Sequence, residues 1–115
     1  MISASACAKT ILFGEHAVVY GYPAIAVPLP DLRVTATFHP ADAELTICSE
    51  DAQVQVDAST QHPLSLIVNL VLEALEMPVP VGVIEIDSQI PIASGLGSGA
   101  AVSTAIARVL LQALN

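Results

Sequence analysis

A glycine-rich segment lies near the end of the sequence and reads Pro91-Ile-Ala-Ser-Gly-Leu-Gly-Ser-Gly-Ala-Ala101. Because glycine has no Cβ, the backbone at the three glycines of this segment can adopt positive φ and approach a ligand closely. The apolar run that follows predicts a helix over 98–114, whose first N–H groups have no intrahelical partner. Those donors and the helix dipole favour an anion, so the segment predicts a phosphate-binding loop. An ordinary helix start, with Ser98 as the N-cap, is the alternative that the segment alone leaves open.

Two known nucleotide-binding patterns fit this segment poorly. Residues 95–100 satisfy the degenerate dinucleotide pattern Gly-x-Gly-x-x-Ala, but that pattern begins at the end of a strand. Here residues 89–94, with Pro91 among them, separate Gly95 from the last strand-like run. A Walker loop ends in Gly-Lys-Ser/Thr, and no lysine lies near. A nucleotide bound here would be held by another loop design.

Length and composition set the outer limits. The 115 residues make one domain at most, near the low end for a domain that also completes a catalytic cleft. Apolar residues make up 54% of the chain, yet charged residues interrupt every long apolar run, so we expect no membrane-spanning segment. The N-terminus lacks a basic region, which argues against a secretory signal. Cys7 and Cys48 have no metal-like spacing and are interpreted as reduced, structural thiols of a cytoplasmic protein.

The net charge of −8 argues against nucleic acid as a partner, because neutralising phosphates needs clustered Lys and Arg. A small anionic ligand stays compatible if backbone N–H groups, a divalent metal and a few placed cations bind it. Lys9 is the only lysine, and the small and apolar residues around it predict a half-buried strand. A buried cation needs a partner, which a bound phosphate would supply. The alternative is a surface lysine in an acidic chain that has few.

The remaining patterns predict an α+β domain. Polar and apolar residues alternate over 33–39, 44–48 and 53–57, which favours an antiparallel meander with one wet face. Turn residues occupy 40–42 and 49–51. A further strand is expected over 83–87, and the apolar run 24–27 predicts a central strand that Pro28 and Pro30 end.

Two helices complete the predicted elements. The first has apolar residues at i, i+3, i+4 and i+7 after Pro63, with His62 in its cap, and Met77-Pro78 ends it.

The second helix, over 98–114, has only a narrow polar stripe of Thr104, Arg108 and Gln112. Such a helix expects burial on more than one side. One sheet covers one flank, so we expect the rest to be covered by chain beyond Asn115 or by a partner.

The segment Phe13-Gly-Glu-His-Ala-Val-Val-Tyr-Gly21 places an acid beside an imidazole just after the strand that carries Lys9. A Glu-His pair alone favours a structural cap or salt bridge. Together with Lys9 and a phosphate loop, Glu15 and His16 form a candidate substrate site.

Two motifs carry a family resemblance. The segment Ala8-Lys-Thr-Ile-Leu-Phe-Gly-Glu-His-Ala-Val-Val-Tyr-Gly21 resembles the first motif of the GHMP small-molecule kinases, in wording most similar to their mevalonate kinase branch. Residues 91–101 resemble the second motif, Pro-x-x-x-Gly-Leu-Gly-Ser-Ser-Ala-Ala. The resemblance implies a two-layer α+β domain with a mixed or antiparallel sheet packed on helices. It also implies that residues 1–115 are part of an N-terminal, ATP-binding domain whose C-terminal partner domain lies outside the chain.

The resemblance also implies roles for individual residues. Lys9 would contact phosphate and help to activate the substrate hydroxyl, and Glu15 and His16 would line the acceptor pocket. The nucleotide contacts would come from Ser88, Ala93, Ser94, Gly95, Leu96, Gly97, Ser98 and Gly99. The implied reaction transfers the γ-phosphoryl group of ATP to the 5-hydroxyl of mevalonate with Mg²⁺, in isoprenoid biosynthesis. Another GHMP kinase, for phosphomevalonate or a sugar, and a noncatalytic binding domain are the alternatives.

The chain departs from the family pattern in two ways. Gly99 stands where the family usually has a serine that binds Mg²⁺, so Ser98 is the remaining candidate metal ligand and we expect weakened Mg²⁺ affinity. The family's catalytic aspartate and metal-binding glutamate lie downstream of the second motif, beyond Asn115. We therefore expect the chain alone to be inactive and to aggregate through helix 98–114. A second copy of the chain, in a homodimer, is the alternative partner.

Overall fold

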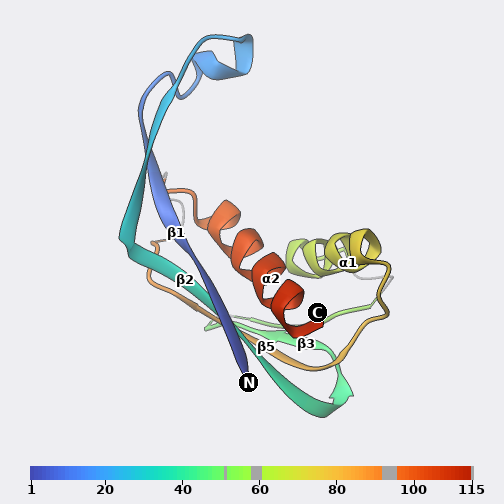
Figure 1. The fold of residues 1–115 in the computed structure, drawn as a ribbon. Helices are drawn as coiled ribbons and strands as arrows, with labels where there is room; N and C mark the ends of the chain where they lie inside the picture. Colours follow the sequence, from blue (N-terminus) through green and yellow to red (C-terminus); the bar gives the residue numbers. More distant parts are fainter. Residues whose placement is uncertain (51, 58–60, 92–95, 115) are drawn as a thin grey trace.

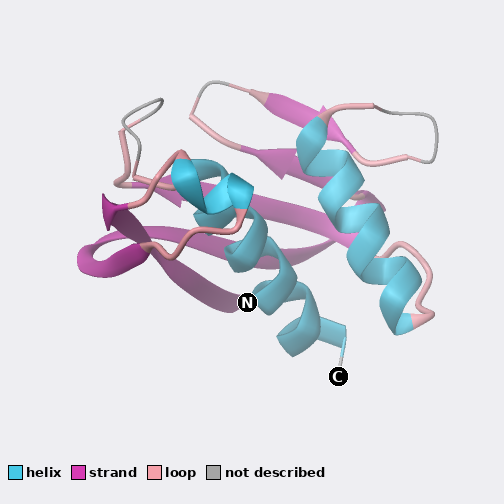
Figure 2. Cartoon of the chain, turned by 90° about the horizontal axis from the view of Figure 1, so that it is seen from above, coloured by secondary structure: helices cyan, strands magenta, loops and turns pink. Residues whose placement is uncertain are grey.

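The computed structural model describes residues 1–50, 52–57, 61–91 and 96–114. The elements in chain order are β1 (Ile2–Phe13), the 3-10 helix η1 (Ala17–Tyr20), β2 (Ile25–Glu44), β3 (Thr46–Cys48), β4 (Gln53–Gln55), α1 (Pro63–Leu75), β5 (Val81–Ser88) and α2 (Ser98–Leu114). The strands form one sheet, and both α-helices lie on the same face of it (Figures 1 and 2). The expected two-layer α+β fold is confirmed.

The strand order is β1-β2-β5-β3-β4. β5 is antiparallel to β2 and parallel to β3, and β3 and β4 form an antiparallel hairpin. The expected meander is therefore wrong, because β2 and β3 follow each other in sequence but β5 lies between them. A parallel neighbour needs a crossover connection, and the segment from β4 through α1 supplies it.

Two local predictions about β2 are also wrong. Pro28 and Pro30 do not end a short central strand, since β2 runs without a break from Ile25 to Glu44. The half of β2 that contains these prolines pairs with β1 alone, because β5 joins it only from Val34 onward. Proline is tolerated where a strand has a free edge. Residues 40–42, expected in a turn, lie within β2 at an irregularity of its register with β5.

The core lies between the sheet and α2. Alternate residues of β1 and β2 face this helix and are buried: Ala4, Ala6, Ala8, Val34, Ala36 and Phe38. The small side chains of the four alanines let the helix come close to the sheet. From the helix side the buried residues are Ala101, Ala105, Ile106, Val109 and Leu110. The polar stripe expected on α2 is exposed as predicted.

The expectation that α2 needs cover from outside the chain is wrong for most of its surface. α1 packs against the second flank of α2, and its Val68 and Leu72 belong to the same buried core. Leu111, at 41% exposed, is the one large apolar residue of α2 that the described residues leave open. The sequence pattern could not show this, because it does not say which helix packs beside which.

The ends of α1 follow the prediction. His62 is its N-cap, and the Nδ1 atom of His62 accepts a hydrogen bond of 3.2 Å from the backbone N–H of Leu64. Pro63 begins the helix, where its missing N–H costs nothing. The helix ends at Leu75, and its C-cap residue Glu76 adopts a left-handed conformation with φ of 54°.

An arm projects from the body of the molecule. It consists of the end of β1, the start of β2 and η1 at its tip (Figure 1). Large apolar residues are exposed along it: Leu12, Phe13, Val18, Val19, Tyr20, Tyr22 and Ile25. Among the described residues, more large apolar side chains are thus exposed on the arm than on α2. No helix among the described residues is long and apolar enough to cross a membrane.

Candidate active site

The start of α2 presents backbone donors that have no partner within the helix. The carbonyl oxygen of Gly97 accepts the first helical hydrogen bond, from the N–H of Ala101 at 3.0 Å, so Gly97 and not Ser98 holds the N-cap position. The N–H groups of Ser98, Gly99 and Ala100 therefore have no partner within the helix. Gly97 has φ of 74°, a conformation that glycine adopts without strain. Such a helix start favours an anion. Ala93, Ser94 and Gly95 lie outside the described residues.

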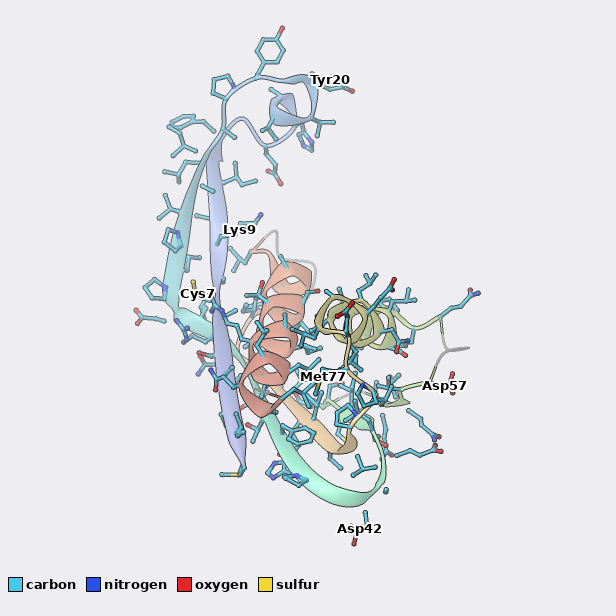
Figure 3. All side chains as sticks on the ribbon, turned by 45° about the vertical axis from the view of Figure 1, so that its right-hand side comes forward. Cys7, Lys9, Tyr20, Asp42, Asp57 and Met77 are labelled. Carbon is cyan, nitrogen blue, oxygen red and sulfur yellow. The ribbon has the colours of Figure 1, made fainter. Side chains whose placement is uncertain are left out.

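Lys9 lies against this helix start. It is half-buried in β1, and its backbone N–H donates a hydrogen bond of 3.0 Å to the carbonyl oxygen of Leu96. Its aliphatic chain passes over Gly97, where an added Cβ would stand 2.9 Å from Lys9 Cε. Figure 3 shows the Lys9 side chain beside the N-terminal end of α2. The structure thus brings the lone lysine to the glycine-rich segment, although Lys9 and Gly97 are 88 positions apart in the sequence.

The two arginines are already engaged within the protein. Arg33 donates to the Ser5 hydroxyl from Nε and Nη2, at 3.1 and 2.9 Å, and Arg108 donates to the Ser5 carbonyl oxygen at 2.7 Å. Among the described residues, the Lys9 ammonium is the one Lys or Arg head group with no hydrogen bond to the protein. A half-buried cation without a partner favours an anionic ligand.

A cavity of about 1050 Å³ opens on the other side of the start of α2. Three predicted nucleotide contacts line it: Ser88 at the end of β5, and Ser98 and Gly99 of α2. Its walls are mostly apolar and come from Leu64, Leu66, Ile67, Leu70, Ile86, Ile90 and Val102. Ser88 Oγ accepts a hydrogen bond from the N–H of Ile90 at 3.2 Å, which fixes the chain where it leaves the sheet. Apolar walls beside a helix N-terminus suit a nucleotide, with the base in the cavity and the phosphates at the helix.

Sequence reasoning missed the wall of this cavity. It predicted an apolar stripe on the first helix, to which Leu64 and Ile67 belong, and it assigned no role to Leu66 and Leu70. These two are exposed and lie one turn apart on α1, off the stripe that packs on the sheet. Apolar residues at i and i+4 outside the core stripe were the signal that could have indicated a second apolar face.

Glu15 and His16 do not form a cluster with Lys9. Both are exposed and lie between β1 and η1 on the arm. Among the described residues, neither side chain makes a hydrogen bond or an ion pair. The described part of the chain therefore forms no closed acceptor pocket around them.

A complete magnesium site is also absent from the described residues. They contain no group of three or more His, Cys, Asp or Glu side chains that could hold a metal. Mg²⁺ binds through one or two carboxylates in addition to substrate phosphates. The Ser98 hydroxyl alone does not meet this requirement, and an added Cβ at Gly99 would meet nothing within 4 Å.

The fold and the helix-start site agree with a family match. Residues 64–115 match the family described as GHMP kinases N terminal domain. This stretch makes up 52 of the 115 residues, and the class of protein to which it is similar is the GHMP kinases.

The particular relatives are mevalonate kinases. The chain is 41% identical over 107 residues to the mevalonate kinase of Methanothermobacter thermautotrophicus, with 90% of the chain and 34% of the relative covered. It is 42% identical over 123 residues to that of Thermococcus sibiricus, covering 90% of the chain and 36% of the relative. The crystal structure of the Methanococcus jannaschii mevalonate kinase superposes with a TM-score of 0.86 at 27% identity, over 99% of this chain and 40% of that one. The chain spans about a third of the length of the curated relatives it matches.

Proposed function

We propose that residues 1–115 form part of the N-terminal, ATP-binding domain of a mevalonate kinase, a phosphotransferase of isoprenoid biosynthesis. The complete enzyme would transfer the γ-phosphoryl group of ATP to the 5-hydroxyl of mevalonate, in the cytoplasm. The similarity to curated mevalonate kinases over 90% of the chain supports this acceptor. The free thiols Cys7 and Cys48 agree with a reducing compartment.

One observation carries the proposal. The Lys9 ammonium, which has no hydrogen-bond partner among the described residues, lies at the start of α2, where three N–H groups have no partner within the helix. A triphosphate bound there would receive backbone hydrogen bonds and the helix dipole from one side and a cation from the other. Phosphoryl transfer depends mainly on positioning and charge stabilisation, and this arrangement supplies both.

The nucleotide base would lie in the cavity between α1 and α2. Leu66, Leu70 and Val102 would pack on the base, while Ser88 and Ser98 would supply polar contacts near the ribose and phosphates. In this arrangement the phosphates face Lys9 and the base faces α1. Ala93 to Gly95 would complete the phosphate loop, as the family resemblance implies.

The acceptor site needs chain beyond the described residues. Glu15 and His16 on the exposed arm would form one wall of it, and the rest would come from the two thirds of the relatives' length that this chain does not span. The family resemblance implies that the catalytic aspartate and the metal-binding glutamate would come from that same part. The described residues do not form a complete Mg²⁺ site.

The test is an acceptor panel on the protein with the additional chain that the relatives have. ATP would be assayed with mevalonate, phosphomevalonate and galactose, following ADP release. We expect turnover with mevalonate alone. Turnover with another acceptor would make the protein a different GHMP kinase, and ATP binding without any turnover would indicate a noncatalytic domain. The 115-residue chain assayed alone should release no ADP.

A further inference from the structure

We propose that Gly97 is a positioning residue for Lys9: the absence of a side chain at 97 is what lets the Lys9 ammonium reach the anion site at the start of α2. This rests on the proposed function. A Cβ added at Gly97 would stand 2.9 Å from Cε of Lys9, 3.1 Å from Cγ and 3.4 Å from Cδ. Three carbons of the Lys9 side chain thus occupy the space where a residue other than glycine at position 97 would have its Cβ.

Two other described glycines, Gly21 and Gly99, show that a close side-chain contact does not follow from the backbone conformation alone. Gly21 has φ of 87°, close to the 74° of Gly97, yet a Cβ at Gly21 would meet nothing within 4 Å. Gly99 lies in the same loop-to-helix segment, has no positive φ and also meets nothing. Gly97 combines the left-handed backbone with a side chain packed on its face. The positive φ at position 97 explains why glycine is favoured there. The contact with Lys9 explains why a larger residue would displace the lysine side chain.

A side chain at 97 would move Lys9 and leave the fold in place. The atom that comes closest is Cε, near the free end of a flexible side chain, so it can shift at little cost in folding free energy. The backbone of Lys9 cannot move with the side chain, because its N–H donates a hydrogen bond to the carbonyl oxygen of Leu96, the residue next to Gly97. The displacement therefore falls on the ammonium. A misplacement of about 1 Å at a reacting group can lower a rate by about a hundredfold.

No other described cation can take over the position. The Arg33 guanidinium is held by the Ser5 hydroxyl, and Arg108 by the Ser5 carbonyl oxygen. Both lie with Ser5, away from the start of α2. A displaced Lys9 ammonium would leave the anion with backbone donors alone.

The first test uses the fact that the chain has a single lysine. Labelling the 115-residue chain with [ε-¹³C]lysine gives one signal, and inorganic triphosphate serves as the probe. We expect the signal to shift on titration in wild type and in Gly21→Ala, which carries the same backbone strain without the contact. In Gly97→Ala the shift should need at least about tenfold more triphosphate. A Gly97→Ala titration that matches wild type overturns the proposal.

A second variant covers the case in which Gly97→Ala does not fold. Lys9→Ala removes the carbons that the new Cβ would meet, so the Gly97→Ala/Lys9→Ala double variant should regain the thermal stability of Gly21→Ala. A double variant that stays unfolded overturns the proposal, because the defect then lies in the backbone and not in the contact with Lys9.

The second test is a double-mutant cycle in the longer protein, with ATP and mevalonate. Gly97→Ala should lower kcat by about tenfold or more in the wild-type background and by less than about twofold in the Lys9→Ala background. Equal losses in both backgrounds overturn the proposal, since Gly97 would then act independently of Lys9. If the wild-type protein has no kinase activity, the proposed function fails, and the lysine signal still decides whether Gly97 positions Lys9.

Discussion

The backbone N–H of Lys9 is bonded to the carbonyl oxygen of Leu96 at 3.0 Å, which ties the outer edge of β1 to the segment that leads into α2. This bond fixes the backbone of the lone lysine beside the start of the helix. Its side chain passes over Gly97 at the start of α2. The relationship links the two motifs of the sequence in a single contact.

Replacing Lys9 by Met should abolish most of the activity of the longer protein. Methionine keeps an unbranched chain of similar length but has no charge, so charge stabilisation is lost while packing on Gly97 is kept. We expect kcat to fall by about a hundredfold or more, measured by steady-state kinetics with ATP and mevalonate. Arg108→Met is the matched control: it removes a cation bonded to Ser5 and should lower stability by about 1 kcal/mol while kcat stays near wild type. Wild-type turnover in Lys9→Met would remove Lys9 from the mechanism.

Replacing Gly99 by Ser should restore the hydroxyl that the family pattern has at this position. The backbone of Gly99 is helical and a Cβ there meets open space, so the variant should fold and gain about 0.5 kcal/mol of stability. We expect the longer protein to reach half-maximal activity at a lower Mg²⁺ concentration. Thermal denaturation and a Mg²⁺ titration measure the two effects. An unchanged Mg²⁺ requirement would contradict the hypothesis that Gly99 weakens metal affinity.

Replacing Glu76 by Gly should stabilise the chain. Glu76 is the C-cap residue of α1 and has φ of 54°, which glycine adopts without the penalty that a side chain brings. We expect a gain of about 1 kcal/mol in the free energy of unfolding, measured by thermal or urea denaturation. Glu73→Gly is the control, since it makes the same change of charge inside the exposed face of the same helix. It should lower stability by about 1 kcal/mol, and a loss in both variants would refute the role assigned to Glu76.

Self-association of the 115-residue chain should depend on the arm. Val19 and Tyr20 at its tip are 79% and 81% exposed, whereas Leu111 of α2 is 41% exposed. Exposed apolar patches of this kind favour association. We expect the double variant Val19→Ser/Tyr20→Ser to weaken concentration-dependent association and Leu111→Ser to have little effect. Sedimentation velocity would measure the association. A larger effect of Leu111→Ser would restore the earlier expectation that helix 98–114 is the exposed surface.

Local patterns predicted the local structure well. The spacing of apolar residues gave α1, with Pro63 and His62 at its start, and the helix from Ser98 to Leu114. These elements depend on contacts between residues three or four apart and on caps formed by neighbours in sequence. The alternation over 33–39 and 83–87 likewise indicated strands, and the structure has both. The prolines of β2 were misread because their effect depends on whether the strand has a second neighbour.

By itself, the sequence determined that a lone lysine, a Gly-Glu-His segment and a glycine-rich helix start occur in one acidic chain, and their wording indicated a kinase family. Only the tertiary structure decided that β5 lies between β2 and β3, that α1 covers the second flank of α2, and that Lys9 packs on Gly97. The cavity between α1 and α2 and the exposed position of Glu15 and His16 on the arm also depend on the tertiary structure. The physical reason is range: periodicity and caps are set by near neighbours in the chain, whereas strand order, helix pairing and the path of a side chain are set by contacts between distant residues.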